Sequence, residues 1–286
     1  MATAVRATRK GKTVPFRGFL AARLIAGAGA AASLLVSGLV TSGAASAAPA
    51  PVHYVALGDS YSSGLGSGSM ISSSGSCDRS TKAYSQLWAT AHHPASYASV
   101  ACAGATTATV VSTQLAALST ATTLVSITVG GNDVGFSSTL ETCILHGQSS
   151  CVTAITADEQ QIASALPGKL NTVLSDIRAR APGARVVVLG YPALYDLSRS
   201  AGCVGLSTTD RTDLNQAAGL LDNAIKAAAG QHADMFEDVR PEFTGHLICD
   251  SGRWLNAVSV LHISQSYHPT ATGQADGYLP AFTDGA

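Results

Sequence analysis

Three short polar sequences contain residue types that could act together on an acyl group. Each follows an apolar run, and they are Gly58-Asp59-Ser60, Cys102-Ala103-Gly104 and Gly130-Gly131-Asn132-Asp133. A serine hydroxyl attacks a carbonyl when a base removes its proton and nearby donors stabilise the resulting oxyanion. Ser60 is therefore a candidate nucleophile. Its own N–H, the N–H of Gly104 and the side-chain amide of Asn132 are candidate donors.

Each of these sequences taken alone is also typical of an ordinary turn or helix cap. Asp59 and Asp133 adjoin the candidate residues, but we expect them to hold their loops by accepting backbone N–H bonds rather than to take part in acid–base chemistry. A functional site is indicated only if the three sequences meet in space.

A serine nucleophile needs a general base, and the chain has eight histidines that could supply one. His268 differs from the others because it ends a polar loop, Ser264-Gln265-Ser266-Tyr267-His268, that Pro269 follows. Proline disfavours helical geometry in the residue before it, so we expect His268 to lie in extended backbone. The chain has no Gly-x-Ser-x-Gly sequence, which argues against the nucleophile elbow of the common α/β-hydrolases.

The candidate residues need a framework, and the pattern of the chain from about residue 52 predicts one. Short apolar runs typical of strands alternate with longer segments in which apolar residues have helical spacing. The predicted strands cover residues 54–57, 97–101, 124–129, 185–189 and 233–236, and the predicted helices 84–91, 109–118, 157–180, 210–229 and 270–281. This alternation predicts a single three-layer α/β/α domain with a mainly parallel five-stranded sheet. Parallel strands place ligand sites at their carboxyl ends, where the three polar sequences would meet in one cleft.

The first 47 residues do not fit this framework. They contain no acidic residue, and an apolar run over residues 24–40 leads to a final Ala45-Ser46-Ala47. The basic residues before that run are Arg6, Arg9, Lys10, Lys12, Arg17 and Arg23. This pattern predicts a secretory signal peptide over residues 1–47 and a secreted, extracellular domain over residues 48–286. A membrane anchor is the alternative, but the apolar run is short and leads directly into a cleavage site.

Removal of this leader would change the charge of the protein. The full chain carries 17 basic and 18 acidic residues, whereas residues 48–286 carry 11 and 18, for a net charge of −7. A protein with this balance has no general electrostatic attraction to nucleic acid or to anionic membranes. We therefore expect no nucleic-acid partner and no stable membrane insertion of the processed protein. We also expect a monomer, since a core of this size needs no partner for stability.

All six cysteines lie beyond the predicted leader. They are Cys77, Cys102, Cys143, Cys151, Cys203 and Cys249. An even number of cysteines in an exported chain predicts disulfides, although the sequence alone leaves the pairing open. The chain has no Cys-x-x-Cys or His-x-x-x-His spacing, and we therefore predict no metal site and no cofactor.

Taken together, the three polar sequences and His268-Pro269 resemble the four sequence blocks of the SGNH (GDSL) hydrolases, in that family's order. Over nearly all of residues 52–286 the chain looks most like the family's secreted actinomycete lipases and esterases. The resemblance implies a flavodoxin-like fold and a carboxylic ester hydrolase of the lipase or esterase type. It implies that Ser60 is the nucleophile, that His268 is the base, and that the oxyanion hole consists of Ser60, Gly104 and Asn132. It also implies three sequential disulfides, Cys77–Cys102, Cys143–Cys151 and Cys203–Cys249.

One position departs from the family pattern. The family usually has an aspartate three residues before the histidine, where it orients the imidazole and stabilises its charged form, but this chain has Gln265. Three alternatives remain open for the group that accepts from the Nδ1–H of His268. They are a main-chain carbonyl of Gln265 or Ser266, the Gln265 side chain, and the carboxylate of Asp238. The main-chain carbonyl is the favoured alternative and Asp238 the least favoured.

These observations predict a secreted serine ester hydrolase that cleaves carboxylic esters by a Ser60–His268 acyl-enzyme mechanism. Fatty-acyl lipid esters are the favoured substrates. Alternatives within the same fold are a phospholipase of the A type and a polysaccharide deacetylase. A catalytically inactive secreted binding protein is the alternative from another class, and Gln265 is the one feature in its favour.

Overall fold

The computed structural model describes residues 50–199, 203 and 205–286. The predicted signal peptide over residues 1–47 lies outside the described residues. Among the residues that the structure does describe, no helix has the length and apolar character needed to cross a membrane.

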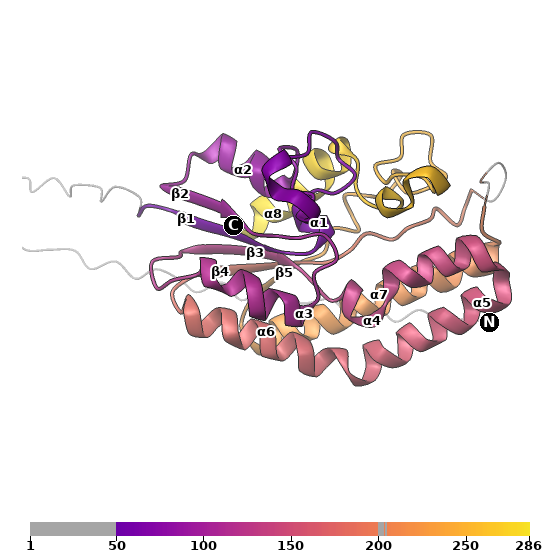
Figure 1. The fold of residues 1–286 in the computed structure, drawn as a ribbon, viewed down its shortest axis with the longest axis horizontal. Helices are drawn as coiled ribbons and strands as arrows, with labels where there is room; N and C mark the ends of the chain where they lie inside the picture. Colours follow the sequence, from indigo (N-terminus) through magenta and orange to yellow (C-terminus); the bar gives the residue numbers. More distant parts are fainter. Residues whose placement is uncertain (1–49, 200–202, 204) are drawn as a thin grey trace, which may run out of the picture. The chain divides into compact units, whose positions relative to one another are not determined.

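Five parallel strands form the central sheet, in the order β2-β1-β3-β4-β5 (Figure 1). Their bounds are β1 His53–Gly58, β2 Ser96–Ser99, β3 Leu124–Thr128, β4 Arg185–Leu189 and β5 Met235–Glu237. The prediction of one α/β domain around a five-stranded parallel sheet is confirmed. Strands β1 and β3 are buried at almost every residue, because helices cover both faces of the sheet.

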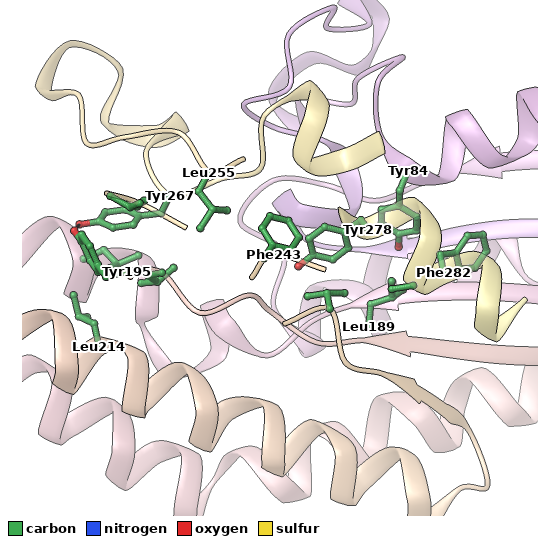
Figure 2. Packing of buried hydrophobic residues seen from close by; sticks show 14 of the residues in the cluster. Tyr84, Leu189, Tyr195, Leu214, Phe243, Leu255, Tyr267, Tyr278 and Phe282 are labelled. Atoms are coloured by element: carbon green, nitrogen blue, oxygen red, sulfur yellow. Dashed lines mark hydrogen bonds between the residues drawn. The ribbon is translucent and has the colours of Figure 1, made fainter. Parts of the chain in front are cut away.

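Helices α2 (Tyr84–His92) and α8 (Leu279–Gly285) cover one face of the sheet (Figure 1). Aromatic side chains fill the space between these two helices and the strands. The ring of Tyr84 lies 5.6 Å from the ring of Tyr278 and 5.4 Å from that of Phe282 (Figure 2). All three side chains are buried, so they anchor the end of the chain against the early part of the fold.

Helices α6 (Leu166–Arg180) and α7 (Thr208–Gln231) cover the opposite face (Figure 1). Each turns an apolar stripe towards the strands. Leu170 of α6 and Leu221 and Ile225 of α7 are fully buried in the core on this side. The three-layer arrangement follows from these two apolar stripes and the aromatic cluster on the other face.

The long helix α5 (Phe136–Ser164) packs mainly against α7 and has one non-helical residue, Gly147, with a φ of +77°. The sequence pattern predicts a single helix over residues 157–180, and this prediction is wrong. The structure has two helices there, α5 and α6, which meet at Ala165. Pro167 accounts for the break, because proline lacks an N–H and is tolerated only in the first turn of a helix.

Short helical turns and three disulfides complete the connections. The turns are α1 Ser60–Ser63, η1 Ser72–Cys77, α3 Thr107–Thr109, η2 Val110–Gln114, η3 Leu115–Ala117, α4 Gly131–Val134, η4 Val260–Gln265 and η5 Gly273–Tyr278. The disulfides join the pairs that the family resemblance implies, Cys77–Cys102, Cys143–Cys151 and Cys203–Cys249. Because the strands are parallel, the loops that follow β1, β2 and β3 all leave the same edge of the sheet.

Candidate active site

Ser60 lies directly after β1, at the start of the short helix α1. The turn into that helix begins at Gly58, which has a φ of +119°, and a Cβ there would lie too close to the carbonyl oxygen of Thr128. Only glycine fits this position. Asp59 then caps the helix, since its carboxylate accepts from the N–H of Tyr61 at 3.0 Å. Together Gly58 and Asp59 fix the position of Ser60 relative to the end of β1.

His268 faces Ser60 from the far end of the chain. Its Nε2 lies 2.7 Å from the Oγ of Ser60, which is hydrogen-bond distance. Its Nδ1 lies 3.1 Å from the main-chain oxygen of Ser266. When Nδ1 carries the proton and donates to that carbonyl, Nε2 is free to accept from the serine hydroxyl. The imidazole therefore joins the Ser60 hydroxyl on one side to a main-chain carbonyl on the other.

The loop that carries His268 is held by backbone pairing and by tyrosine hydroxyls. The N–H of Asn256 donates to the carbonyl of His268 at 2.9 Å, and the N–H of Tyr267 donates to the carbonyl of Asn256 at 2.9 Å. The side chain of Tyr267 is buried, and its hydroxyl lies 2.7 Å from that of Tyr195 (Figure 2). The Tyr61 hydroxyl donates to the carbonyl of Tyr267 at 3.1 Å. These contacts connect the histidine loop to α1, the short helix that begins at Ser60.

Of the three alternatives for orienting His268, the main-chain carbonyl is the one that lies at the imidazole. The Gln265 carbonyl accepts from the backbone N–H of His268 at 3.3 Å, whereas Gln265 itself is exposed. The carboxylate of Asp238 instead accepts from Arg240, with 2.7 Å to Nε and 2.6 Å to Nη2. Burial lowers the pKa of His268 to about 4, and the carbonyls of Ser266 and Gln265 oppose that shift. The imidazole is therefore neutral at pH 7 and able to accept a proton.

The loops after β2 and β3 carry the candidate oxyanion donors. Asn132 donates from Nδ2 to the carbonyl of Ala105 at 3.1 Å, which leaves its second amide hydrogen for a ligand. Gly104 has a φ of +77° and is exposed. Within the described part of the chain, no backbone hydrogen bond uses the N–H of Ser60 or of Gly104. Ser60, Asn132 and His268 line one pocket, while Gly104 is not among its lining residues.

Asp133 ties these two loops together. Its side chain is 2% exposed, and its carboxylate accepts from the N–H of Thr107 at 2.8 Å and from the Thr107 hydroxyl at 2.7 Å. The ammonium group of Lys169 lies 3.8 Å from the same carboxylate. Through these bonds the segment that follows Gly104 is fixed relative to Asn132.

Tyr191, which no sequence motif singles out, joins the nucleophile loop to the Asn132 loop. Its hydroxyl donates to the Asp59 carboxylate at 2.5 Å and accepts from the N–H of Gly131 at 3.3 Å. Asp59 also accepts from the Thr128 hydroxyl at 2.7 Å. Burial raises the pKa of Asp59 to about 6, and these hydrogen bonds oppose the rise. The signal that could have identified Tyr191 is its position just after β4, at one more carboxyl end of the parallel sheet.

A pocket of about 190 Å³ lies beside Ser60 and His268. Its polar lining includes Asn132 and, on α5, Glu141. The apolar lining comes mainly from α5, α7 and the loops after β4 and before His268, and includes Phe136, Leu140, Ile144, Tyr191, Pro192, Leu194, Ala218, Leu221 and Ile263. Nowhere among the described residues do three or more histidine, cysteine or acidic side chains lie together as metal ligands would. The site thus combines a candidate nucleophile, a candidate base and candidate donors with a surface suited to an apolar chain.

The sequence matches the GDSL-like Lipase/Acylhydrolase family over residues 56–275, which is most of the chain. The chain belongs to this family and is a carboxylic ester hydrolase. It is 50% identical to Lipase 1 of Streptomyces coelicolor over 269 residues, which are 94% of this chain and 97% of that protein. The structure of phospholipase A1 from Streptomyces albidoflavus NA297 matches with a TM-score of 0.81 and 47% identity, over 83% of this chain and 100% of that one. The structure of the extracellular lipase from Streptomyces rimosus matches with a TM-score of 0.80 and 46% identity, over 82% and 100%.

Replacing Asp133 by alanine should lower the free energy of unfolding by roughly 2–4 kcal/mol, because two charge-assisted hydrogen bonds to Thr107 are lost. Chemical denaturation followed by circular dichroism measures this change. Asp276→Ala is the matched control, since Asp276 is an exposed aspartate, and it should change the stability by no more than about 0.5 kcal/mol. Equal stability of the two variants would show that Asp133 does not hold the loops together.

Proposed function

We propose that this protein is a secreted lipase that cleaves fatty-acyl esters through a Ser60–His268 dyad. The observation that carries the proposal is the 2.7 Å contact between the Ser60 Oγ and the His268 Nε2, beside a largely apolar pocket. A nucleophile within hydrogen-bond reach of a base is the arrangement that acyl transfer needs. An ester carbonyl placed at Ser60 would have the apolar lining available for its acyl chain.

The first half of the reaction forms an acyl-enzyme. His268 Nε2 takes the proton of the Ser60 hydroxyl as Oγ bonds to the ester carbonyl carbon. The carbonyl oxygen becomes an oxyanion, which the N–H groups of Ser60 and Gly104 and the amide of Asn132 stabilise. His268 then gives its proton to the leaving alcohol as the bond between that oxygen and the carbonyl carbon breaks.

The second half releases the acid. A water molecule takes the place of the alcohol, gives a proton to His268 and bonds to the acyl carbon. The bond between that carbon and the Ser60 Oγ breaks, and Oγ recovers the proton from His268. Through both halves the Ser266 carbonyl fixes the imidazole tautomer, although a carbonyl dipole stabilises the imidazolium less than a carboxylate would.

Cleavage of an acyl chain from a phospholipid is the second candidate. It is favoured by the 47% identity to an enzyme described as a phospholipase A1. Both candidates place a fatty-acyl chain in the pocket and differ only in the alcohol that leaves. Polysaccharide deacetylation is less favoured, because the apolar lining offers a sugar few hydrogen-bonding partners.

Secretion is part of the same proposal, with residues 1–47 as a leader and residues 48–286 as the catalytic domain. The three disulfides support it, since disulfides persist in oxidising compartments. The description of the Streptomyces rimosus lipase as extracellular also supports it.

A p-nitrophenyl phosphonate and a series of p-nitrophenyl esters test the function together. The phosphonate should label Ser60 stoichiometrically, and it should not label the Ser60→Ala variant. Along the ester series kcat/KM should rise from acetyl to longer acyl chains, because added methylene groups become buried in the pocket. A folded protein that is not labelled would favour the inactive binding protein. A maximum at the acetyl ester would contradict the fatty-acyl preference.

Replacing Asn132 by alanine should lower kcat by about 10²- to 10³-fold with little change in KM, because an oxyanion donor acts mainly in the transition state. Steady-state kinetics on one soluble ester measures both constants. Asn171→Ala, on α6 and outside the pocket lining, is the matched control and should leave kcat unchanged. An unchanged kcat in Asn132→Ala would remove Asn132 from the mechanism.

On the acid side, kcat/KM should fall with a midpoint below pH 6.5 and closer to pH 4, because burial of His268 opposes its protonation. This fall is the acid limb of the pH profile. The neutral imidazole is the active form, so activity should be retained above this limb and lost as the pH falls through it. Asp238→Asn and Gln265→Ala should each keep most of the activity and the same limb. A loss of about 10³-fold in Asp238→Asn would identify Asp238 as the orienting group. An acid limb at or above pH 6.5 would contradict the lowered pKa.

A further inference from the structure

Two large apolar side chains are unusually exposed, Leu261 at 86% and Leu145 at 51%. No other large apolar side chain among the described residues is as exposed as these two. A single exposed leucine is ordinary, but these two belong to elements that also line the pocket.

Both leucines adjoin pocket-lining residues along the chain. Leu145 follows Ile144 in α5 and lies four residues after Glu141, and both of these residues line the pocket. Residues four apart share one face of a helix, so Leu145 extends the pocket-lining face of α5. Leu261 lies in the turn η4, two residues before the pocket-lining Ile263. We refer to Ile144, Leu145, Leu261 and Ile263 as the apolar rim.

We propose that the apolar rim docks the protein on a lipid surface with neutral or zwitterionic head groups. This inference rests on the proposed function, in which the pocket takes a fatty-acyl chain. Such a chain must leave its lipid aggregate to reach Ser60, and crossing water would expose its methylene groups at a cost that grows with chain length. An apolar rim that enters the same lipid aggregate gives the acyl chain a continuous apolar path into the pocket.

Charge decides which kind of lipid surface fits. The described residues carry 11 basic and 18 acidic side chains, so the processed protein that we propose, with a net charge of −7, is repelled by an anionic bilayer. The two carboxyl side chains of the pocket lining, Asp59 and Glu141, are acidic as well. Insertion of leucines therefore supplies the attraction, and salt should not weaken it. Four side chains also offer far less area than the roughly 1,200 Å² that a stable protein partner needs.

Vesicle co-sedimentation tests the docking directly. The Ser60→Ala variant is used as the background so that the vesicles stay intact. It should bind phosphatidylcholine vesicles equally at low and high salt, and bind less when phosphatidylglycerol is added. Leu261→Asp and Leu145→Asp should each lower the partition coefficient by about 10-fold or more, because the variant no longer transfers that leucine side chain from water into the lipid. Met235→Asp is the matched control, since Met235 is 41% exposed but lies in β5, outside the pocket lining.

Activity assays with Ser60 intact separate the docking from the proposed function. Leu261→Asp should hydrolyse soluble p-nitrophenyl acetate as the unchanged protein does, which also shows that it is folded, and should lose activity only on vesicle-bound ester. Docking at the rim is overturned if Leu261→Asp and Leu145→Asp bind as well as Met235→Asp. It is overturned equally if binding needs phosphatidylglycerol and disappears in salt. The same holds if Leu261→Asp loses activity on the soluble ester as well as on the vesicle-bound ester. If the unchanged protein binds vesicles but cleaves no long-chain ester, the proposed function fails and the docking stands.

Discussion

Burying a carboxylate is costly unless several donors face it, and Asp59 is buried at the end of β1 with such donors in place. Its two oxygens accept from the N–H of Tyr61 in its own turn, from the Thr128 hydroxyl at the end of β3, and from the Tyr191 hydroxyl beyond β4. Three strand ends are thereby held to one group. Ser60 is the next residue in the chain, so the same bonds set its position relative to the loops that carry the candidate donors.

The imidazole of His268 is arranged differently, because a neutral carbonyl orients it instead of an anion. Without an adjacent negative charge, burial dominates and the neutral form is favoured. In the mechanism that we propose, the base is then mostly unprotonated at pH 7 but intrinsically weaker, so the proposed oxyanion donors must supply more of the transition-state stabilisation. Asp133 acts indirectly, because its hydrogen bonds to Thr107 hold together the loops that carry the candidate donors.

The sheet was predictable, and the candidate site residues could be chosen, because their signals are local. The run Arg185–Leu189 reads as a buried strand on its own, and Ser60, Asn132 and His268 stand in short recognisable sequences. The place of Tyr191 after β4 was a local signal, but its role was not predictable, because its partner Asp59 is 132 residues away and only the folded chain brings the two together. The break between α5 and α6 had a local signal in Pro167, but the apolar spacing on either side of it predicted one continuous helix.

The disulfide Cys77–Cys102 immediately precedes the loop that carries Gly104, and the N–H of Ala103 donates to the carbonyl of Cys77 at 3.1 Å. One flank of this loop is thus attached covalently to the last residue of η1, while Asp133 holds the other through Thr107. In a reducing compartment the covalent attachment is absent. Completion of this loop is therefore coupled to the redox state of the surroundings.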